Sequence, residues 1–222
     1  MSILQLADAK THMRVTITDD DDLIQSKIDA AEGTLKLLFV SHYNYYRNFE
    51  TLFRAIPAIK KLLAPRPVEL LLTCRLRSEQ NPGSYQADSA ASVVQELGIA
   101  ENVRELGSVP YQLLLHVYKS CDIYVTPAYA ESFAHPLVEA MSSGLPVVAS
   151  DLAVHREICG QAGVYFSRFS SDDLARQVAS LASDSAAAKE MARLGLLRSL
   201  DFSWKRHVTE LLELANRMVR SQ

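Results

Sequence analysis

The sequence predicts an α/β fold in which a single doubly wound domain is built on a parallel sheet of about six strands, followed by C-terminal helices. Two observations support this prediction. From Leu35 onward, short apolar runs alternate with longer segments whose apolar residues recur at helical spacing. The length of 222 residues, 48% of them hydrophobic and 22% charged, allows one sizeable core. It falls short of two full α/β domains of roughly 150 residues each.

The expected strands are short and continuously apolar, which suits a sheet covered by helices on both faces. They are residues 36–41, 68–73, 103–106, 122–126, 146–149 and 164–166.

The first expected helix has one apolar face, made of Phe49, Leu52, Phe53, Ile56 and Leu63. Pro57 should bend or interrupt this helix, because proline removes a backbone donor.

Two further helices are marked by the apolar sets Val93, Val94 and Leu97, and Leu113, Leu114 and Val117. The first of them should end near Gly98, and Pro110 is well placed in the first turn of the second. The alternation of strands and helices over residues 35–200 predicts a Rossmann-like domain.

Helices are also expected at 171–183 and 185–198, and a final amphipathic helix within 201–222 opens at Ser203, a good N-cap. The apolar stripe of that helix consists of Trp204, Val208, Leu211, Leu212, Ala215, Met218 and Val219. Such a stripe must bury one face against something, and packing on its own domain is the simplest interpretation.

The N-terminal residues 1–34 are polar and weakly periodic, which indicates a solvated, flexible extension. Its acidic run from Asp19 to Asp22 is a poor metal site, because consecutive residues on flexible backbone point in different directions.

Charge and cysteine usage exclude several classes of protein. The formal net charge of −3 gives no broad basic surface for nucleic acid. Cys74, Cys121 and Cys159 lack metal-ligand spacing and are expected to be buried, reduced thiols. Without a signal peptide or a long apolar run, a cytoplasmic protein is expected, and peripheral contact with the inner membrane face stays open.

The candidate site lies between Tyr124 and Ser150, in the stretch YVTPAYAESFAHPLVEAMSSGLPVVAS. Pro136 should open a helix that Gly144 closes. Backbone N–H groups at the start of that helix could then face an anion, among them those of Ala134, His135, Leu137 and Val138.

Two carboxylates flank this helix start, Glu131 before it and Glu139 in its first turn. Both would repel a phosphate, but each could accept hydrogen bonds from ribose or sugar hydroxyls, at about 1.5 to 3 kcal/mol per bond. The ligand implied is a phosphate flanked by polyols. Taken singly, Glu139 could instead complement the helix dipole, and Glu131 could be a solvated loop residue.

The stretch resembles the E-x7-E signature of the retaining glycosyltransferases called group 1 or family 4, which have the two-domain GT-B fold. The matching residues are Glu131, Ser132, Phe133, Ala134, Pro136, Glu139, Ala140, Met141, Gly144, Pro146, Val147, Val148, Ala149 and Ser150. The resemblance covers about residues 35–220, which correspond to the carboxy-terminal, donor-binding half of that fold.

The resemblance implies transfer of a sugar from a nucleoside diphosphate donor, with a UDP-sugar as the expected one, to an acceptor hydroxyl with retention of configuration. Glu139 would hold the ribose, and Glu131 would contact the transferred sugar. The amides near Phe133 to His135 would bind the diphosphate, in a donor-binding set that includes Ser132, Ala134 and Leu137. No metal or other cofactor is implied.

The chain departs from the family after the first strand, where the family has Gly-Arg and, five residues later, Lys followed by Gly or Asn. Ser41 and His42 stand in the first positions, and Arg47 and Asn48 in the second. Arg47 keeps a permanent cation and is expected to be catalytic together with Glu131. His42 is mostly neutral at cytoplasmic pH, which weakens the expected stabilisation of the leaving group.

Other histidines invite different roles. His135 could act as a general base, although in the family its position contributes its backbone amide. His155 and His207 are expected to be structural or exposed.

The amino-terminal acceptor domain of the resembled enzymes has no counterpart of its length here, so the chain could be an excised domain, a natural half that pairs with a partner chain, or a remnant. The acceptor, a saccharide or a lipid-linked molecule, would bind in that absent half. The apolar stripe of the last helix could then be partly exposed and support a homo-oligomer. Alternatives to a transferase are a nucleotide-sugar-binding module without turnover and a nucleotide-sugar epimerase.

Overall fold

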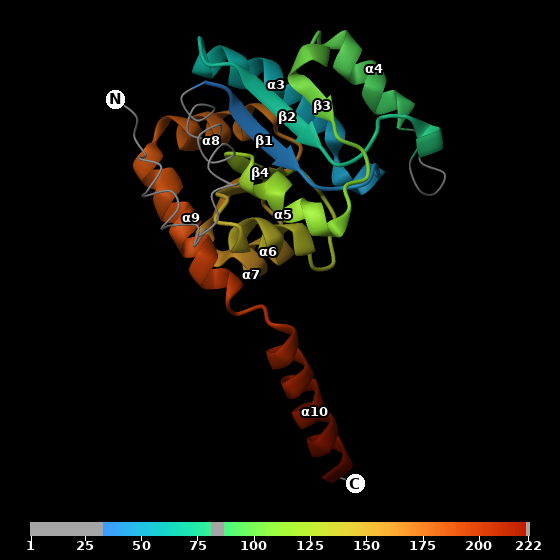
Figure 1. Cartoon of the computed structure of the whole chain (residues 1–222), viewed down its shortest axis with the longest axis vertical. Coiled ribbons are helices and arrows are strands. Elements are labelled where there is room, and N and C mark those ends of the chain that lie inside the picture. The colour runs from blue at the N-terminus through green and yellow to red at the C-terminus, as the bar shows by residue number, and fades with distance from the viewer. Residues whose placement is uncertain (1–32, 81–86, 221–222) are drawn as a thin grey trace.

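The structure is a computed structural model that describes residues 33–80 and 87–220. Its centre is a parallel sheet of six strands in the order β3-β2-β1-β4-β5-β6 (Figure 1). The strands are β1 (Leu35–Phe39), β2 (Val68–Leu72), β3 (Val103–Glu105), β4 (Ile123–Thr126), β5 (Val147–Ser150) and β6 (Gly163–Phe166). This is the order of a doubly wound sheet, so the predicted fold class is confirmed.

Helices cover both faces of the sheet. They are α3 (Phe49–Leu63), α4 (Asp88–Glu96), α5 (Tyr111–Lys119), α6 (His135–Ser142), α7 (Ala153–Cys159), α8 (Ser171–Ser183), α9 (Ser185–Ser199) and α10 (Trp204–Arg220). Short 3-10 turns complete the chain at η2 (Tyr45–Arg47), η3 (Ser78–Gln80), η4 (Ala100–Asn102) and η5 (Gly160–Ala162).

The core consists of two apolar clusters, one on each face of the sheet. Alternation along β1 sends Leu37 to the face covered by α3, α4 and α8, and Leu38 to the face covered by α5, α6 and α7. Both side chains are fully buried, which is why the strands read as continuous apolar runs.

The helices differ from the prediction at two places. The helix α3 runs without interruption through Pro57, whose ring faces solvent while the opposite face packs on the sheet. That packing outweighs the loss of one backbone hydrogen bond. The helix α7 was not predicted, because seven residues are too few to show a helical period.

The three cysteines form no disulfide. Burial raises the pKa of the Cys74 and Cys159 thiols to about 12, so both stay protonated, as expected of buried thiols. Cys121 differs from the prediction, since it is only partly buried.

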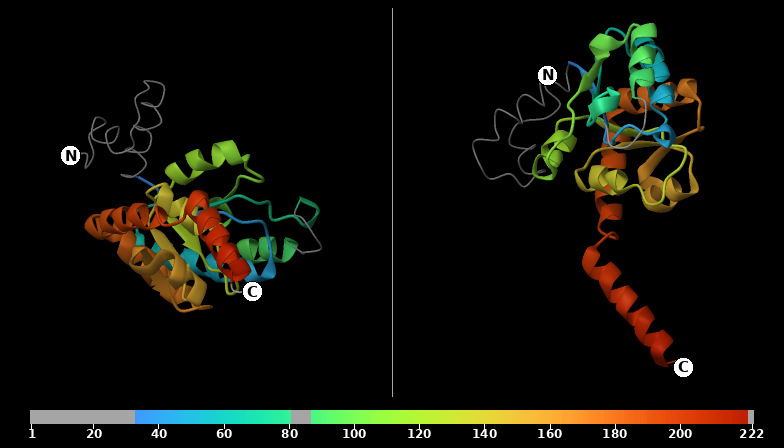
Figure 2. Two further views of the ribbon diagram at one scale, coloured as in Figure 1. Left: turned by 90° about the horizontal axis from the view of Figure 1, so that it is seen from below. Right: turned by 90° about the vertical axis from the view of Figure 1, so that its right-hand side faces the viewer.

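The last helix, α10, projects away from the sheet domain in Figure 1 and in the right-hand view of Figure 2. Its apolar stripe is exposed along its length, and the Trp204 side chain is 76% accessible to solvent. Packing on its own domain, the simplest interpretation of the stripe, is therefore wrong. The predicted N-terminal extension lies outside the described residues except for Gly33 and Thr34, and so does the acidic run from Asp19 to Asp22.

Candidate functional site

The candidate site lies at the carboxyl ends of β1 and β4, the two neighbouring central strands at which the order of the sheet reverses. In a doubly wound sheet the chain leaves two such strands toward opposite faces, which opens a crevice between the loops that follow them. Here these loops contain Arg47 and Glu131, so the fold brings together residues that are 84 positions apart in the sequence.

Hydrogen bonds join the two loops directly. The Asn48 side-chain amide donates to the Pro127 carbonyl over 3.0 Å, and the Tyr129 N–H donates to the Tyr46 carbonyl over 2.9 Å. The backbone of Asn48 is left-handed, with φ of 55°, a conformation that asparagine tolerates better than most residues. The edge of the crevice is thus held by main-chain and side-chain contacts from both strands.

Arg47 and Glu131, the predicted catalytic pair, form an ion pair with each other through Arg47 Nη1 and Glu131 Oε2. Both side chains are largely buried, at 16% and 8% exposure. The sequence predicted a cation and a carboxylate facing a ligand, but it gave no sign of their direct pairing. In this conformation each group neutralises the other in a site with little water.

The start of α6 supplies the predicted anion-facing amides. Ala134 is the N-cap with φ of 61°, and Pro136 follows in the first turn, as the sequence predicts. Within residues 33–80 and 87–220, no partner is found for the N–H groups of Phe133, Ala134 and His135. These are the donors that a helix start can offer to a phosphate.

Two further predicted donors are already engaged in this structure. The Leu137 N–H donates to the Ala134 carbonyl over 2.9 Å, and the Leu137 side chain is fully buried. The Ser132 N–H donates to Glu131 Oε1 over 3.1 Å.

Glu139 is the fifth residue of α6, one turn after His135 and just beyond the first turn in which the sequence placed it. Its carboxylate accepts a hydrogen bond of 2.7 Å from the hydroxyl of Tyr118, which comes from α5 and is buried. Burial raises the pKa of that hydroxyl well above its ordinary range, so it stays protonated and donates. Sequence reasoning missed Tyr118, because one tyrosine at a helix end carries no signal of its own.

The candidate histidines are spread over different environments. His42 is exposed after β1, and His135 is exposed with its ring 4.7 Å from the Phe133 ring. His207 is exposed on α10, whereas His155 is fully buried. Burial lowers the pKa of His155, which keeps its imidazole neutral.

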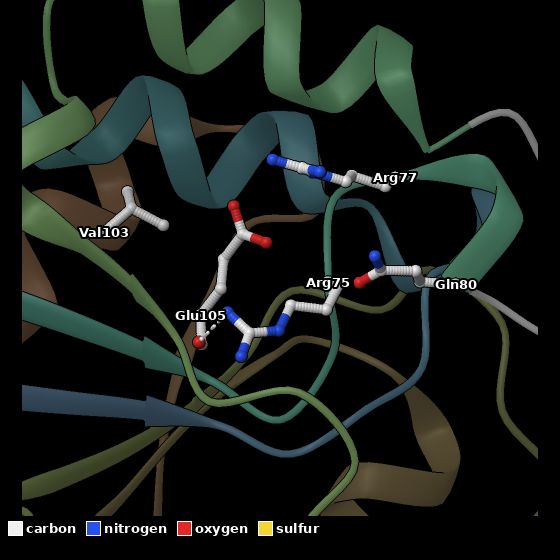
Figure 3. A pocket seen from close by; sticks show the side chains of 5 residues that line it. All are labelled: Arg75, Arg77, Gln80, Val103 and Glu105. Carbon is white, nitrogen blue, oxygen red and sulfur yellow. Dashed lines mark hydrogen bonds between the residues drawn. The ribbon is translucent and has the colours of Figure 1, made fainter.

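A hollow of about 440 Å³ opens at the same edge of the sheet, beside β2 and β3 (Figure 3). It is lined by Arg75, Arg77, Gln80, Val103 and Glu105. Arg75 Nη1 donates to the Glu105 carbonyl over 2.7 Å, and the Leu76 N–H donates to the Glu105 carboxylate over 2.9 Å. The sequence did not predict this hollow, which is lined by residues of β3 and of the segment after β2 rather than by the motif.

Two kinds of feature are absent from the described ranges, 33–80 and 87–220. No group of three or more His, Cys, Asp or Glu side chains in them could hold a metal ion. No helix in them is both long and apolar enough to cross a membrane.

The fold and the site together define a Rossmann-like α/β domain whose crevice, at the reversal of its sheet, has backbone amides at a helix start and two carboxylates. The model of the family Glycosyl transferases group 1 matches residues 20–195. The chain belongs to this family.

Curated relatives include the D-inositol 3-phosphate glycosyltransferase of Nocardia farcinica, which is 27% identical over 191 residues, or 85% of this chain and 42% of that protein. The O-antigen chain mannosyltransferase B of Escherichia coli is 30% identical over 110 residues, or 50% of this chain and 29% of that protein. The chain thus spans less than half the length of these relatives.

Two solved structures share the fold over more than nine tenths of this chain. The sucrose-phosphate synthase of Thermosynechococcus elongatus has a TM-score of 0.73 at 20% identity, covering 97% of this chain and 49% of that one. The Anabaena protein HepE, in complex with UDP, has a TM-score of 0.70 at 19% identity, covering 93% and 54%.

Proposed function

We propose that this chain is the donor-binding half of a retaining glycosyltransferase, which transfers a sugar from a UDP-sugar to an acceptor hydroxyl. The observation that carries the proposal is the meeting of Arg47, Glu131 and the start of α6 at the reversal of the sheet. Membership of the group 1 family and a structural neighbour in complex with UDP support it.

In this proposal the diphosphate lies against the free amides of Phe133, Ala134 and His135, and Arg47 turns from Glu131 to the phosphate oxygens. Its planar guanidinium can bind two oxygens at once, which suits the negative charge that develops on a leaving diphosphate. Glu131, released from the ion pair, accepts hydrogen bonds from the transferred sugar and orients it.

Glu139 would hold the ribose hydroxyls with the carboxylate oxygen that Tyr118 leaves free. Ser132 and Leu137 stay in the donor-binding set. Their amides must first release the Glu131 carboxylate and the Ala134 carbonyl, respectively, before they can bind the donor. Because His42 is exposed after β1, we assign it a smaller part of the phosphate binding.

The positive helix end and Arg47 would replace a metal in neutralising charge, so binding should survive a chelator. The acceptor, a saccharide or a lipid-linked molecule, would bind to an amino-terminal domain or a partner chain, since the relatives are more than twice as long. A cytoplasmic location, with peripheral contact to the inner membrane face, fits such acceptors.

Calorimetric titration with UDP, GDP and ADP tests the proposal. We expect UDP to bind, and Arg47→Ala and Glu139→Ala to weaken it by roughly ten- to a hundredfold, the effect of losing a charge-assisted hydrogen bond. The matched controls are Arg54→Ala and Glu50→Ala, which break an exposed ion pair on α3 and should leave UDP affinity unchanged. Absence of binding by the folded chain to all three nucleotides would refute a preformed donor site.

A second candidate is a nucleotide-sugar-binding module without turnover, favoured by the Arg47–Glu131 pair that occupies both catalytic groups. It predicts UDP binding but no transfer or hydrolysis, even when an amino-terminal domain of a relative is supplied.

A further inference from the structure

His155 lies behind the candidate site, as the third residue of α7, and its side chain is fully buried. Its Nδ1 is 2.9 Å from the carbonyl oxygen of Ser150 and 3.2 Å from the Ser150 hydroxyl. A carbonyl can only accept, so Nδ1 carries the proton and Nε2 has the free lone pair.

Ser150, the last residue of β5, also contacts the loop that bears Glu131. Its hydroxyl donates to the carbonyl of Ala128, which precedes Glu131 by three residues. On the opposite side, the same loop is tied to the β1 loop by the Asn48–Pro127 and Tyr46–Tyr129 hydrogen bonds. The loop that bears Glu131 is therefore hydrogen-bonded on one side to the loop after β1 and on the other side to Ser150 at the end of β5.

Packing alone does not account for a histidine at this position. Its Nε2 atom is buried without a hydrogen-bond partner in the described part of the chain, and so is Nε of Arg47. An apolar side chain of similar size would fill the space without this cost. The polar contact through Nδ1 is what a histidine adds here.

We propose that His155 is a positioning residue for Glu131, acting through Ser150 and the carbonyl of Ala128. The inference rests on the proposed function, in which Arg47 leaves Glu131 to bind the diphosphate. At that moment the loop loses its ion pair to the β1 side, and the contact from β5 and α7 keeps the Glu131 carboxylate facing the sugar.

Two substitutions of His155 separate the polar contact from packing. In His155→Asn the amide nitrogen takes the place of Nδ1 and can still donate to Ser150. In His155→Gln the amide takes the place of Nε2, and the bond to Ser150 is lost. Ser150→Ala removes the bond to Ala128 and the hydroxyl contact with His155, but leaves the Ser150 carbonyl that accepts from Nδ1. His207→Gln on the exposed α10 is the control.

The measurement is hydrogen exchange of the backbone amides of residues 129–134, with and without UDP, together with UDP affinity. In the free protein, His155→Gln and Ser150→Ala should raise exchange in this segment roughly tenfold, as the loss of one buried hydrogen bond implies, whereas His155→Asn should remain close to wild type. Addition of UDP should widen the difference between the variants, because the ion pair of Arg47 is then withdrawn.

Wild-type exchange in both His155→Gln and Ser150→Ala would overturn the inference. So would equal defects in His155→Asn and His155→Gln, because packing would then be the whole role of the side chain. If the wild type fails to bind UDP, the proposed function fails, but exchange in the free protein still decides whether His155 and Ser150 hold the loop.

Discussion

At the scale of single residues, the site depends on buried groups that orient exposed ones. Glu139 has one carboxylate oxygen bound to the Tyr118 hydroxyl, and this contact crosses from α5 to α6. A carboxylate at the edge of a crevice would otherwise sample several rotamers. In the proposed function, fixing it in advance would reduce the entropy lost when a ribose binds.

Tyr118→Phe should therefore weaken UDP binding roughly three- to tenfold, as expected for the loss of one hydrogen bond, without unfolding the protein. Calorimetric titration checks the affinity. The control is Tyr165→Phe, which removes a hydroxyl bonded to the Gly160 carbonyl after α7 and should leave UDP affinity unchanged. Equal affinities of Tyr118→Phe and wild type would show that Glu139 does not need this contact.

At the scale of elements, the apolar stripe of α10 predicts a buried face, but this face is exposed to solvent. Its apolar stripe has the width of a core-facing helix, yet the sheet domain offers it no surface. An exposed apolar face of this size is typical of a surface for association. Pairing with a second copy or with an acceptor domain remains a proposal that the stripe supports.

Leu211→Ala on this stripe should change the free energy of unfolding of the monomer by less than about 0.5 kcal/mol, since the described part of the chain leaves Leu211 exposed. Leu52→Ala, on the buried face of α3, should cost about 2 to 5 kcal/mol. Urea unfolding at low protein concentration measures both.

If the stripe joins two copies, Leu211→Ala should also shift sedimentation toward the monomer at high concentration. A large loss of monomer stability in Leu211→Ala would instead mean that α10 folds back on the domain in solution.

At the scale of the whole molecule, the stability of the sheet domain depends on the protonation state of a buried histidine. His155 is the titratable side chain most affected near neutral pH among the described residues, because burial lowers its pKa from the ordinary value of 6.5. The unfolded chain therefore takes up a proton at a pH where the folded chain does not.

This difference makes stability depend on pH. Well above pH 6.5 neither state binds the proton, and the full stability is present. As the pH falls below 6.5 toward the lowered folded pKa, the unfolded state gains protons and stability is lost, by at most about 1.4 kcal/mol per pH unit.

Urea unfolding at pH 7.5 and 5.5 should show this loss in the wild type and a smaller loss in His155→Asn, which has no proton to bind at that position. His207→Gln removes an exposed histidine and should behave as wild type. Identical pH dependence in His155→Asn and wild type would show that His155 is accessible to protons in the folded state.

The sequence by itself determined the class of fold, the extent of most strands and helices, and membership of the glycosyltransferase family. These features are local: a strand is a short apolar run, a helix repeats at its own period, and the E-x7-E stretch lies within a single strand, loop and helix. The structure differs from the prediction at Pro57, where tertiary packing outweighs the local effect of proline on a helix. It also differs at α7, which is too short to show a helical period.

The tertiary structure alone decided which side chains meet. The Arg47–Glu131 pair joins two loops 84 residues apart, the Tyr118–Glu139 bond joins two helices, and the burial of His155 depends on β5 and α7 together. Such contacts depend on how the strands are ordered in the sheet, and no periodicity or motif along one segment records that order. The same reason explains α10. Its apolar stripe predicts that one face is buried, and only the folded structure shows that the sheet domain does not bury it.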